Sequence, residues 1–201
     1  MARASDLLAL ARGELGVTES PRGSNKVKYN DAYGGGPKAW CCVFLWWLFQ
    51  MAGAAVLFFG GGKTAYCPTL LSWFKKMGQL VKGDPEPGDI VFFDFNGNGT
   101  PDHVGICESY DGARITTIDG NTGEGNEANG GAVMRRTRSM STVCAVCRPA
   151  YEPERAVEKA DSWAKEAWSW AVNTGLMDGT RPKEPLTRQE FAVVLHKLKK
   201  E

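Results

Sequence analysis

Two adjacent cysteines, Cys41 and Cys42, open an almost wholly apolar segment that continues to residue 53, and a glycine-rich stretch precedes them. A segment of this length and composition is predicted to form a buried helix. The unpaired N–H groups at the first turn of a helix favour a thiolate, and such a position lowers a cysteine pKa from about 8.5 to roughly 3.5–7.5. A thiolate is a nucleophile, so the chemistry predicted here requires a base.

His103 is the credible base among the two histidines of the chain. The other, His196, lies in a lysine-rich segment near the end of the chain, where a solvated helix face explains it. His103 opens a predicted strand, and the next predicted strand ends with Asp119 and Asn121, either of which could orient the imidazole. A cysteine, a histidine and an orienting polar group form the arrangement of papain-like hydrolases. The residues alone leave a structural role for the cysteines as the alternative.

Four motifs, in this order, resemble those of the CHAP family (cysteine, histidine-dependent amidohydrolase/peptidase), and the resemblance covers roughly residues 5–150. They are WCCVF at residues 40–44, PGDIVFF at 87–93, DHVGI at 102–106 and IDGNT at 118–122. The order of all four makes this resemblance specific, whereas each motif alone is weak.

The resemblance implies a role for each matching residue. Cys41 is expected to be the nucleophile and His103 the general base. Asp119 stands where the family commonly has glutamate, so Asp119 and Asn121 are expected to share the orientation of the ring. Cys42 is expected to be core, and the backbone N–H of Cys41 to stabilise the oxyanion. The same resemblance places Trp40 and Tyr33 at the substrate.

By this resemblance the substrate is peptidoglycan, and the bond is an amide in the peptide stem, in the cross-bridge or between stem and sugar. Hydrolysis through an acyl-enzyme requires no metal or organic cofactor. The function so implied is that of a bacteriophage endolysin acting on a Gram-positive host. The alternatives are an NlpC/P60-like peptidase of the stem peptide and a wall-binding module that does not cut.

The loop before His103 carries oxygen ligands at alternate positions, followed by glycine: Asp94, Asn96, Asn98 and then Asp102. Calcium loops share this pattern, which makes calcium a candidate ion. Gly105, however, replaces the late bidentate carboxylate of an EF-hand. The alternative is a simple hairpin turn, which Asn-Gly-Asn-Gly also favours.

The surrounding periodicity predicts an α+β domain of papain-like type, with helices first and an antiparallel sheet afterwards. Helices are predicted over residues 3–15, 25–32, 41–53 and 68–77. Strands are predicted over residues 88–93, 103–107, 114–118, 131–134 and 142–146.

The last forty residues are similar to one S-layer-homology repeat. The predicted organisation is therefore a catalytic domain over residues 1–151, a linker over 152–160 and a wall-binding helical segment over 161–201. A capping box at residues 187–190 is predicted to start the final helix. Such repeats are associated with secondary cell-wall polymer, generally in three copies. Wall binding, self-association and packing on the catalytic domain are the three roles considered for this single copy.

Composition excludes several other classes. Lys+Arg 24 against Asp+Glu 23 gives a formal charge of +1, which offers no general attraction to nucleic acid or to an anionic membrane. The longest apolar run is too short for a membrane span. The six cysteines are expected to be reduced, and the pair Cys144 and Cys147 is expected to be buried in a strand rather than to bind zinc.

The first fourteen residues have charges within and around their short apolar run, so they do not resemble a secretory signal. The expected location follows: the enzyme is made in the host cytoplasm and reaches the wall after holin-type release.

Overall fold

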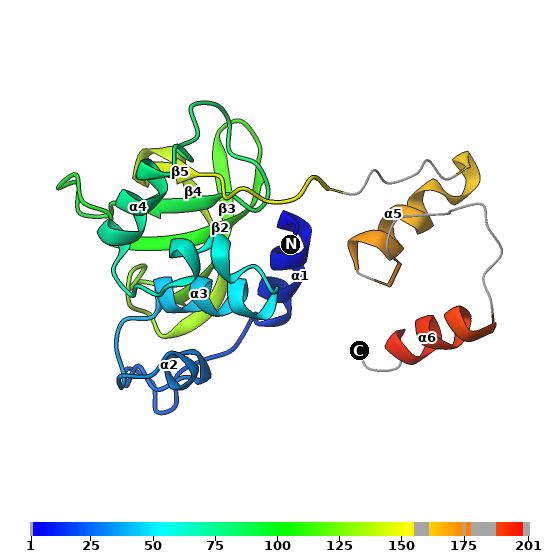
Figure 1. Ribbon diagram of the computed structural model, residues 1–201, viewed down its shortest axis with the longest axis horizontal. Helices are drawn as coiled ribbons and strands as arrows, with labels where there is room; N and C mark the ends of the chain where they lie inside the picture. Colours follow the sequence, from blue (N-terminus) through cyan, green and yellow to red (C-terminus); the bar gives the residue numbers. More distant parts are fainter. Residues whose placement is uncertain (1, 155–160, 175, 178–187, 199–201) are drawn as a thin grey trace. The chain divides into compact units, whose positions relative to one another are not determined.

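The structure is a computed structural model that describes residues 2–154, 161–174, 176–177 and 188–198. The chain divides into two compact units, Met1–Glu152 and Pro153–Glu201 (Figure 1). Each unit is described by itself. The catalytic and wall-binding roles predicted for the two segments remain predictions.

A five-stranded antiparallel sheet forms one layer of the first unit (Figure 1). Its strands run in the order β4-β3-β2-β1-β5, so consecutive strands are neighbours except where β5 returns to the far edge beside β1. The helices precede the sheet in the chain, which confirms the predicted α+β class and the papain-like order of elements. The strands are β1 Ile90–Phe93, β2 His103–Tyr110, β3 Arg114–Thr122, β4 Ala132–Ser139 and β5 Val143–Cys147.

Alternation along the strands separates two apolar clusters, one on each face of the sheet. On β1, Ile90 and Phe92 belong to the main core, which the helices cover. Val91 and Phe93 belong to a smaller cluster on the opposite face. This is why all four residues of β1 are buried.

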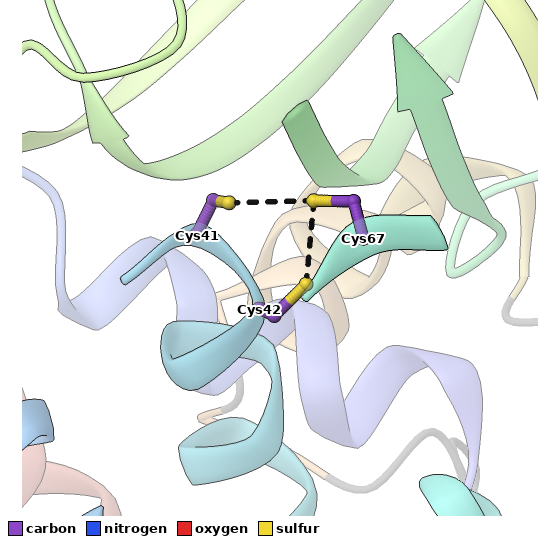
Figure 2. Close-up of side chains that lie close together, drawn as sticks. All are labelled: Cys41, Cys42 and Cys67. Atoms are coloured by element: carbon purple, nitrogen blue, oxygen red, sulfur yellow. Dashed lines mark hydrogen bonds between the residues drawn. The ribbon is translucent and has the colours of Figure 1, made fainter. Parts of the chain in front are cut away.

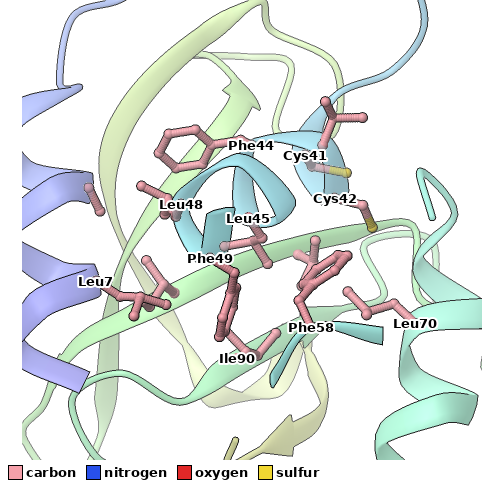
Figure 3. Close-up of a cluster of buried hydrophobic side chains, with 14 of the residues drawn as sticks. Leu7, Cys41, Cys42, Phe44, Leu45, Leu48, Phe49, Phe58, Leu70 and Ile90 are labelled. Carbon is pink, nitrogen blue, oxygen red and sulfur yellow. The ribbon is translucent and has the colours of Figure 1, made fainter. Parts of the chain in front are cut away.

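Helix α3, Cys41–Met51, is the centre of the main core (Figure 3). Seven of its eleven residues are buried, and it packs on β2 and β3. Each large apolar side chain that is fully buried contributes about 1.5–3 kcal/mol relative to an exposed one. The other helices of this unit are α1 Ala4–Gly13, α2 Lys28–Tyr33 and α4 Cys67–Lys76, with short 3-10 turns η1 Ala55–Leu57, η2 Phe59–Gly61 and η3 Met140–Thr142.

The two cysteines of β5 have different environments. Cys147 is buried, as predicted. The expected burial of Cys144 is wrong, because this side chain is exposed on β5, which is an edge strand of the sheet.

The second unit contains η4 Ser162–Ala164, α5 Lys165–Asn173 and α6 Arg188–Leu198. Its large apolar side chains are mostly exposed within the described residues, with Trp163 at 87% and Phe191 at 54%. His196 is exposed, as expected. The predicted capping box begins at residue 187, which lies outside the described residues. No helix in the described part of the chain combines the length and the apolar composition that crossing a membrane would require.

Candidate active site

Cys41 is the first residue of α3 and is only 3% exposed. The preceding Trp40 makes no side-chain cap to the helix. The N–H groups of the first turn therefore have no capping side chain, and the positive end of the helix dipole lies beside the sulfur. These N–H groups are also available to an oxyanion that forms on a carbonyl bound at Cys41.

Two other thiols surround the Cys41 sulfur. Hydrogen bonds with Cys42 and Cys67 lower the pKa of the Cys41 thiol well below its usual range, and His103 lowers it further, although burial opposes both effects. The pKa values of Cys42 and Cys67 are raised instead, first through their hydrogen bonds with Cys41. Cys41 is therefore the thiolate of the group, and its two neighbours are neutral donors.

His103 is the first residue of β2 and is completely buried. Its Nε2 lies 3.1 Å from Oδ2 of Asp119. Its Nδ1 is buried without a hydrogen bond, and this is the nitrogen that remains for proton exchange with the Cys41 thiol. Burial lowers the pKa of His103, but the hydrogen bond to Asp119 and the interaction with Cys41 outweigh it and raise the pKa to about 9.

Asp119 lies on β3, and an arginine holds it from β4. Nη1 of Arg138 is 2.8 Å from Oδ2 of Asp119. The guanidinium also stacks over the ring of Phe93, with 4.6 Å between its carbon and the ring centroid, and it forms an ion pair with Glu127 at 2.7 Å. Burial raises the pKa of Asp119, but His103 and Arg138 outweigh it and leave the pKa below its usual value. Asp119 therefore stays ionised beside the imidazole.

Gly105 and Gly120 allow the close contacts of Asp119 with β2 and of helix α3 with β3. A Cβ at position 105 would lie 2.0 Å from Oδ1 of Asp119, and one at position 120 would lie 2.4 Å from Cβ of Phe44 in α3. Both separations are too short for a real Cβ atom, so a residue other than glycine would force its neighbours to move. Gly105 thus admits the carboxylate beside His103, and Gly120 lets the cysteine helix lie close to β3.

The structure separates the two residues that were predicted to share the orientation of the ring. Asp119 contacts His103, whereas the Nδ2 of Asn121 donates to Oδ1 of Asn129 at 2.9 Å. Asn121 also has a φ of 61°, in the left-handed region that asparagine tolerates better than most residues. Its position at the end of the ladder between β3 and β4 accounts for this, because the register shifts between Asp119 and Thr122.

The two predicted substrate residues differ in accessibility. Trp40 is 0% exposed, and its Nε1 donates to Oε1 of Glu19 at 2.8 Å. Trp40 is thus buried and hydrogen-bonded in this structure, and its contact with a substrate stays a prediction. Tyr33 is half-buried and lies between Lys38 and Lys63, whose nitrogens are 5.1 and 4.6 Å from the ring centroid. Tyr33 remains a candidate contact for substrate.

Arg138 and Cys67 were not predicted to belong to the site. Neither has a local signal, because Arg138 is one of three arginines on β4 and Cys67 stands alone before Pro68. The strand register places Arg138 opposite Ile115 and Met134 opposite Asp119. Pairing β4 with β3 therefore puts Arg138 on the face of the sheet that carries Asp119, but the register alone does not pair the two residues.

The candidate calcium loop forms a compact turn. Asp94 accepts backbone N–H groups from Gly97 and Asn98 at Oδ1 and from Gly99 at Oδ2, and Asp102 accepts from Phe95. Backbone N–H groups surround the carboxylate of Asp94. The remaining lone pairs of Asp94 and Asp102, together with the side-chain oxygens of Asn96 and Asn98, could still bind a calcium ion. Calcium at this loop thus stays a prediction.

For a calcium loop, we expect EDTA to lower the melting temperature and the activity, and added CaCl2 to restore both, because Asp102 directly precedes His103. Thermal unfolding followed by circular dichroism, in parallel with wall hydrolysis, measures this. A melting temperature and an activity that EDTA leaves unchanged would exclude calcium.

The pKa shifts predict a bell-shaped dependence of activity on pH. As the pH rises through the lowered pKa of Cys41, the nucleophilic thiolate forms and activity increases. As the pH rises further through about 9, the imidazolium of His103 loses its proton and activity falls. Initial rates of hydrolysis measured from about pH 5 to about pH 10.5 cover both limbs. A rate that still rises above pH 10 would contradict the ion pair.

The candidate site lies in a part of the chain that is similar to a known protein family. Residues 31–121 match the family model described as "CHAP domain". The match covers a little less than half of the chain and includes Cys41, His103, Asp119 and Asn121. No curated protein is similar enough to match the chain.

Several solved structures are similar to the chain. The crystal structure of Ly7917 is 20% identical, with a TM-score of 0.45 and coverage of 74% of this chain and 62% of that one. The crystal structure of Ly7917 with the hydrolyzing product of MDP is 21% identical, with a TM-score of 0.43 and coverage of 73% and 62%. The wild-type endolysin LysIME-EF1 is 16% identical, with a TM-score of 0.47 and coverage of 76% and 66%. The chain thus spans less than two thirds of the length of these proteins.

Proposed function

We propose that this chain is a cysteine hydrolase that cleaves an amide bond of peptidoglycan, as an endolysin does. The observation that carries the proposal is the arrangement of Cys41, His103 and Asp119. Nε2 of His103 lies 3.1 Å from Oδ2 of Asp119, and Nδ1 makes no hydrogen bond, so it can exchange a proton with the Cys41 thiol. The match to the CHAP domain over residues 31–121 supports the substrate class. A bacteriophage origin and a Gram-positive host belong to the same proposal.

The proposed reaction has two halves. The Cys41 thiolate attacks the amide carbonyl carbon, and the N–H groups at the start of α3 stabilise the oxyanion. When the C–N bond breaks, the imidazolium of His103 gives its proton to the leaving amine, which leaves an acyl-enzyme. His103 then takes a proton from water as the water attacks the thioester, and the carboxylic acid departs as the thiolate and the imidazolium form again.

Asp119 and Arg138 position the base in this mechanism. The carboxylate fixes the ring so that Nδ1 is the nitrogen available to sulfur, and it stabilises the imidazolium of each half-reaction. Arg138 in turn fixes the carboxylate from β4 at 2.8 Å. Neither residue is expected to touch substrate.

The proposal is tested by digestion of purified cell walls with the reduced wild-type protein, followed by mass spectrometry of the soluble fragments. We expect new amino and carboxyl termini at one kind of amide bond. Cleavage confined to the stem peptide would favour an NlpC/P60-like peptidase. No cleavage across walls of several chemical types would refute hydrolysis and favour a module that only binds walls.

We further propose that the second unit contributes to wall binding, as its resemblance to an S-layer-homology repeat implies. Its exposed aromatic side chains, Trp163 at 87% and Trp170 at 53%, support a binding role. We expect a chain truncated after residue 154 to pellet with purified walls at least about fivefold less than the full chain at equal concentration. Sedimentation equilibrium of the same two proteins tests self-association, and equal pelleting of both would refute the targeting role.

A further inference from the structure

Three thiols meet where helices α3 and α4 begin (Figure 2). The Sγ atom of Cys67 lies 3.6 Å from that of Cys41 and 3.4 Å from that of Cys42. All three atoms lie within 4.8 Å of one another, and all three residues are buried. In the proposed hydrolysis only the Cys41 sulfur reacts, and Cys42 and Cys67 serve it as neutral hydrogen-bond donors; the same three thiols together also form a set of metal ligands.

We infer that Cys41, Cys42 and Cys67 form a binding site for a soft divalent cation such as zinc, and that the bound cation silences the nucleophile. The inference about silencing rests on the proposed function, whereas the binding site itself does not. Figure 2 shows the three sulfurs converging on one region between the two helix starts, with their carbon atoms on the outside.

The spacing of the sulfurs favours a shared cation over a disulfide. Zinc–thiolate bonds of about 2.3 Å at tetrahedral angles place two sulfurs about 3.8 Å apart. The separations of 3.6 and 3.4 Å are within a few tenths of an ångström of that value. The sulfurs of a disulfide are about 2.05 Å apart, whereas these three cysteines are free thiols in the structure.

Three thiolates leave the fourth position of a tetrahedral cation to water or to another small ligand. Among the described residues, the ligand atoms that lie within 4.8 Å of one another are those of the three cysteines. His103 interacts with Cys41 but lies outside this group. Three thiolates suit zinc and similar soft cations, and they disfavour magnesium and calcium.

Occupancy has a direct chemical consequence. The thiols of Cys42 and Cys67 release their protons to solvent when they become ligands, and a lone pair of the Cys41 thiolate is taken by the cation. A coordinated Cys41 cannot attack a carbonyl. Removal of the cation by a chelator restores the thiolate without any change of covalent structure.

The test is a titration of the reduced, metal-free full chain with Co2+ in the absence of oxygen. We expect one equivalent to bind, with the thiolate-to-cobalt charge-transfer absorption of several sulfur ligands and the visible bands of tetrahedral cobalt, and we expect Zn2+ to displace it. Cys67→Ser should weaken binding at least about 100-fold. Cys144→Ser is the matched control, because Cys144 is exposed on β5, and it should bind as the wild type does.

A second measurement separates this site from ordinary inhibition of a cysteine enzyme. We expect Zn2+ to inhibit wall hydrolysis by the wild type, EDTA to reverse it, and Cys67→Ser to need at least about 100-fold more Zn2+ for half-inhibition of its own metal-free rate. Circular dichroism confirms that the variant is folded, and Cys67→Ala replaces it if it is not. Absence of the charge-transfer band, or binding by Cys67→Ser equal to that of the wild type, would overturn the inference. If the metal-free wild type cuts no wall, the proposed function fails while the cobalt titration still decides the site.

Discussion

Cys41→Ser is expected to lower the rate of wall hydrolysis by at least about 1,000-fold, because a serine hydroxyl at this position has no lowered pKa and is a far weaker nucleophile toward an amide. Cys42→Ser should lose less than about tenfold, since a hydroxyl can still donate a hydrogen bond to the Cys41 thiolate. Release of soluble fragments from purified walls measures both rates. The two residues are adjacent and both buried, so the pair is a matched comparison.

The folded state of both variants has to be compared before the rates are interpreted. A sulfur-to-oxygen change in a buried site costs roughly 1–2 kcal/mol when the hydroxyl is left poorly hydrogen-bonded, and thermal unfolding measures this. If Cys42→Ser abolishes cleavage and Cys41→Ser retains it with an equal melting temperature, the nucleophile has been assigned to the wrong cysteine.

Asp119→Asn is expected to have the second largest effect, a loss of roughly 10²- to 10⁴-fold in rate. The neutral amide cannot stabilise the imidazolium, and it can turn its NH2 group toward the ring and favour the wrong tautomer. Because the hydrogen bond to Asp119 and the Cys41 interaction are what raise the pKa of His103 to about 9, the falling limb of the pH profile should move to lower pH. A role in stability alone would not move that limb.

Asn121→Gly is the matched control for this variant. Glycine accepts the φ of 61° at this position, so the backbone is preserved while the carboxamide is lost. We expect a smaller loss than for Asp119→Asn and no displacement of the falling limb. A larger loss with a displaced limb would show that Asn121, rather than Asp119, controls the imidazole.

Much of the first unit could be predicted because its signals are local. The apolar run after Cys41, the change of period after residue 87 and the turns between strands predict helices followed by an antiparallel sheet. His103 follows from residue type, because a nucleophile at a helix start needs a base and the chain offers one suitable histidine. The choice of Cys41 as the nucleophile rests on the resemblance to the CHAP family. The order of elements then brings the two together.

The remaining parts of the site depend on contacts between distant segments. Arg138 reaches Asp119 only because β4 pairs with β3 in one register, and Cys67 reaches Cys41 only because α4 begins beside α3. The choice between Asp119 and Asn121 depends on the shift of register between Asp119 and Thr122. The burial of Trp40 could not be predicted either, since a helix-start residue can point to solvent or, as here, toward Glu19.

Helix α3 connects catalytic competence to global stability, because the residue at its first position is the nucleophile and the rest of the helix is the middle of the core (Figure 3). Cys41 cannot leave its place through a local opening, since the same backbone carries Phe44, Leu45 and Leu48, which are all buried. Heating should therefore leave the domain fully active until it unfolds as a whole, so that the curves of residual activity and of ellipticity coincide. Core substitutions that raise the melting temperature should extend the working range by the same number of degrees.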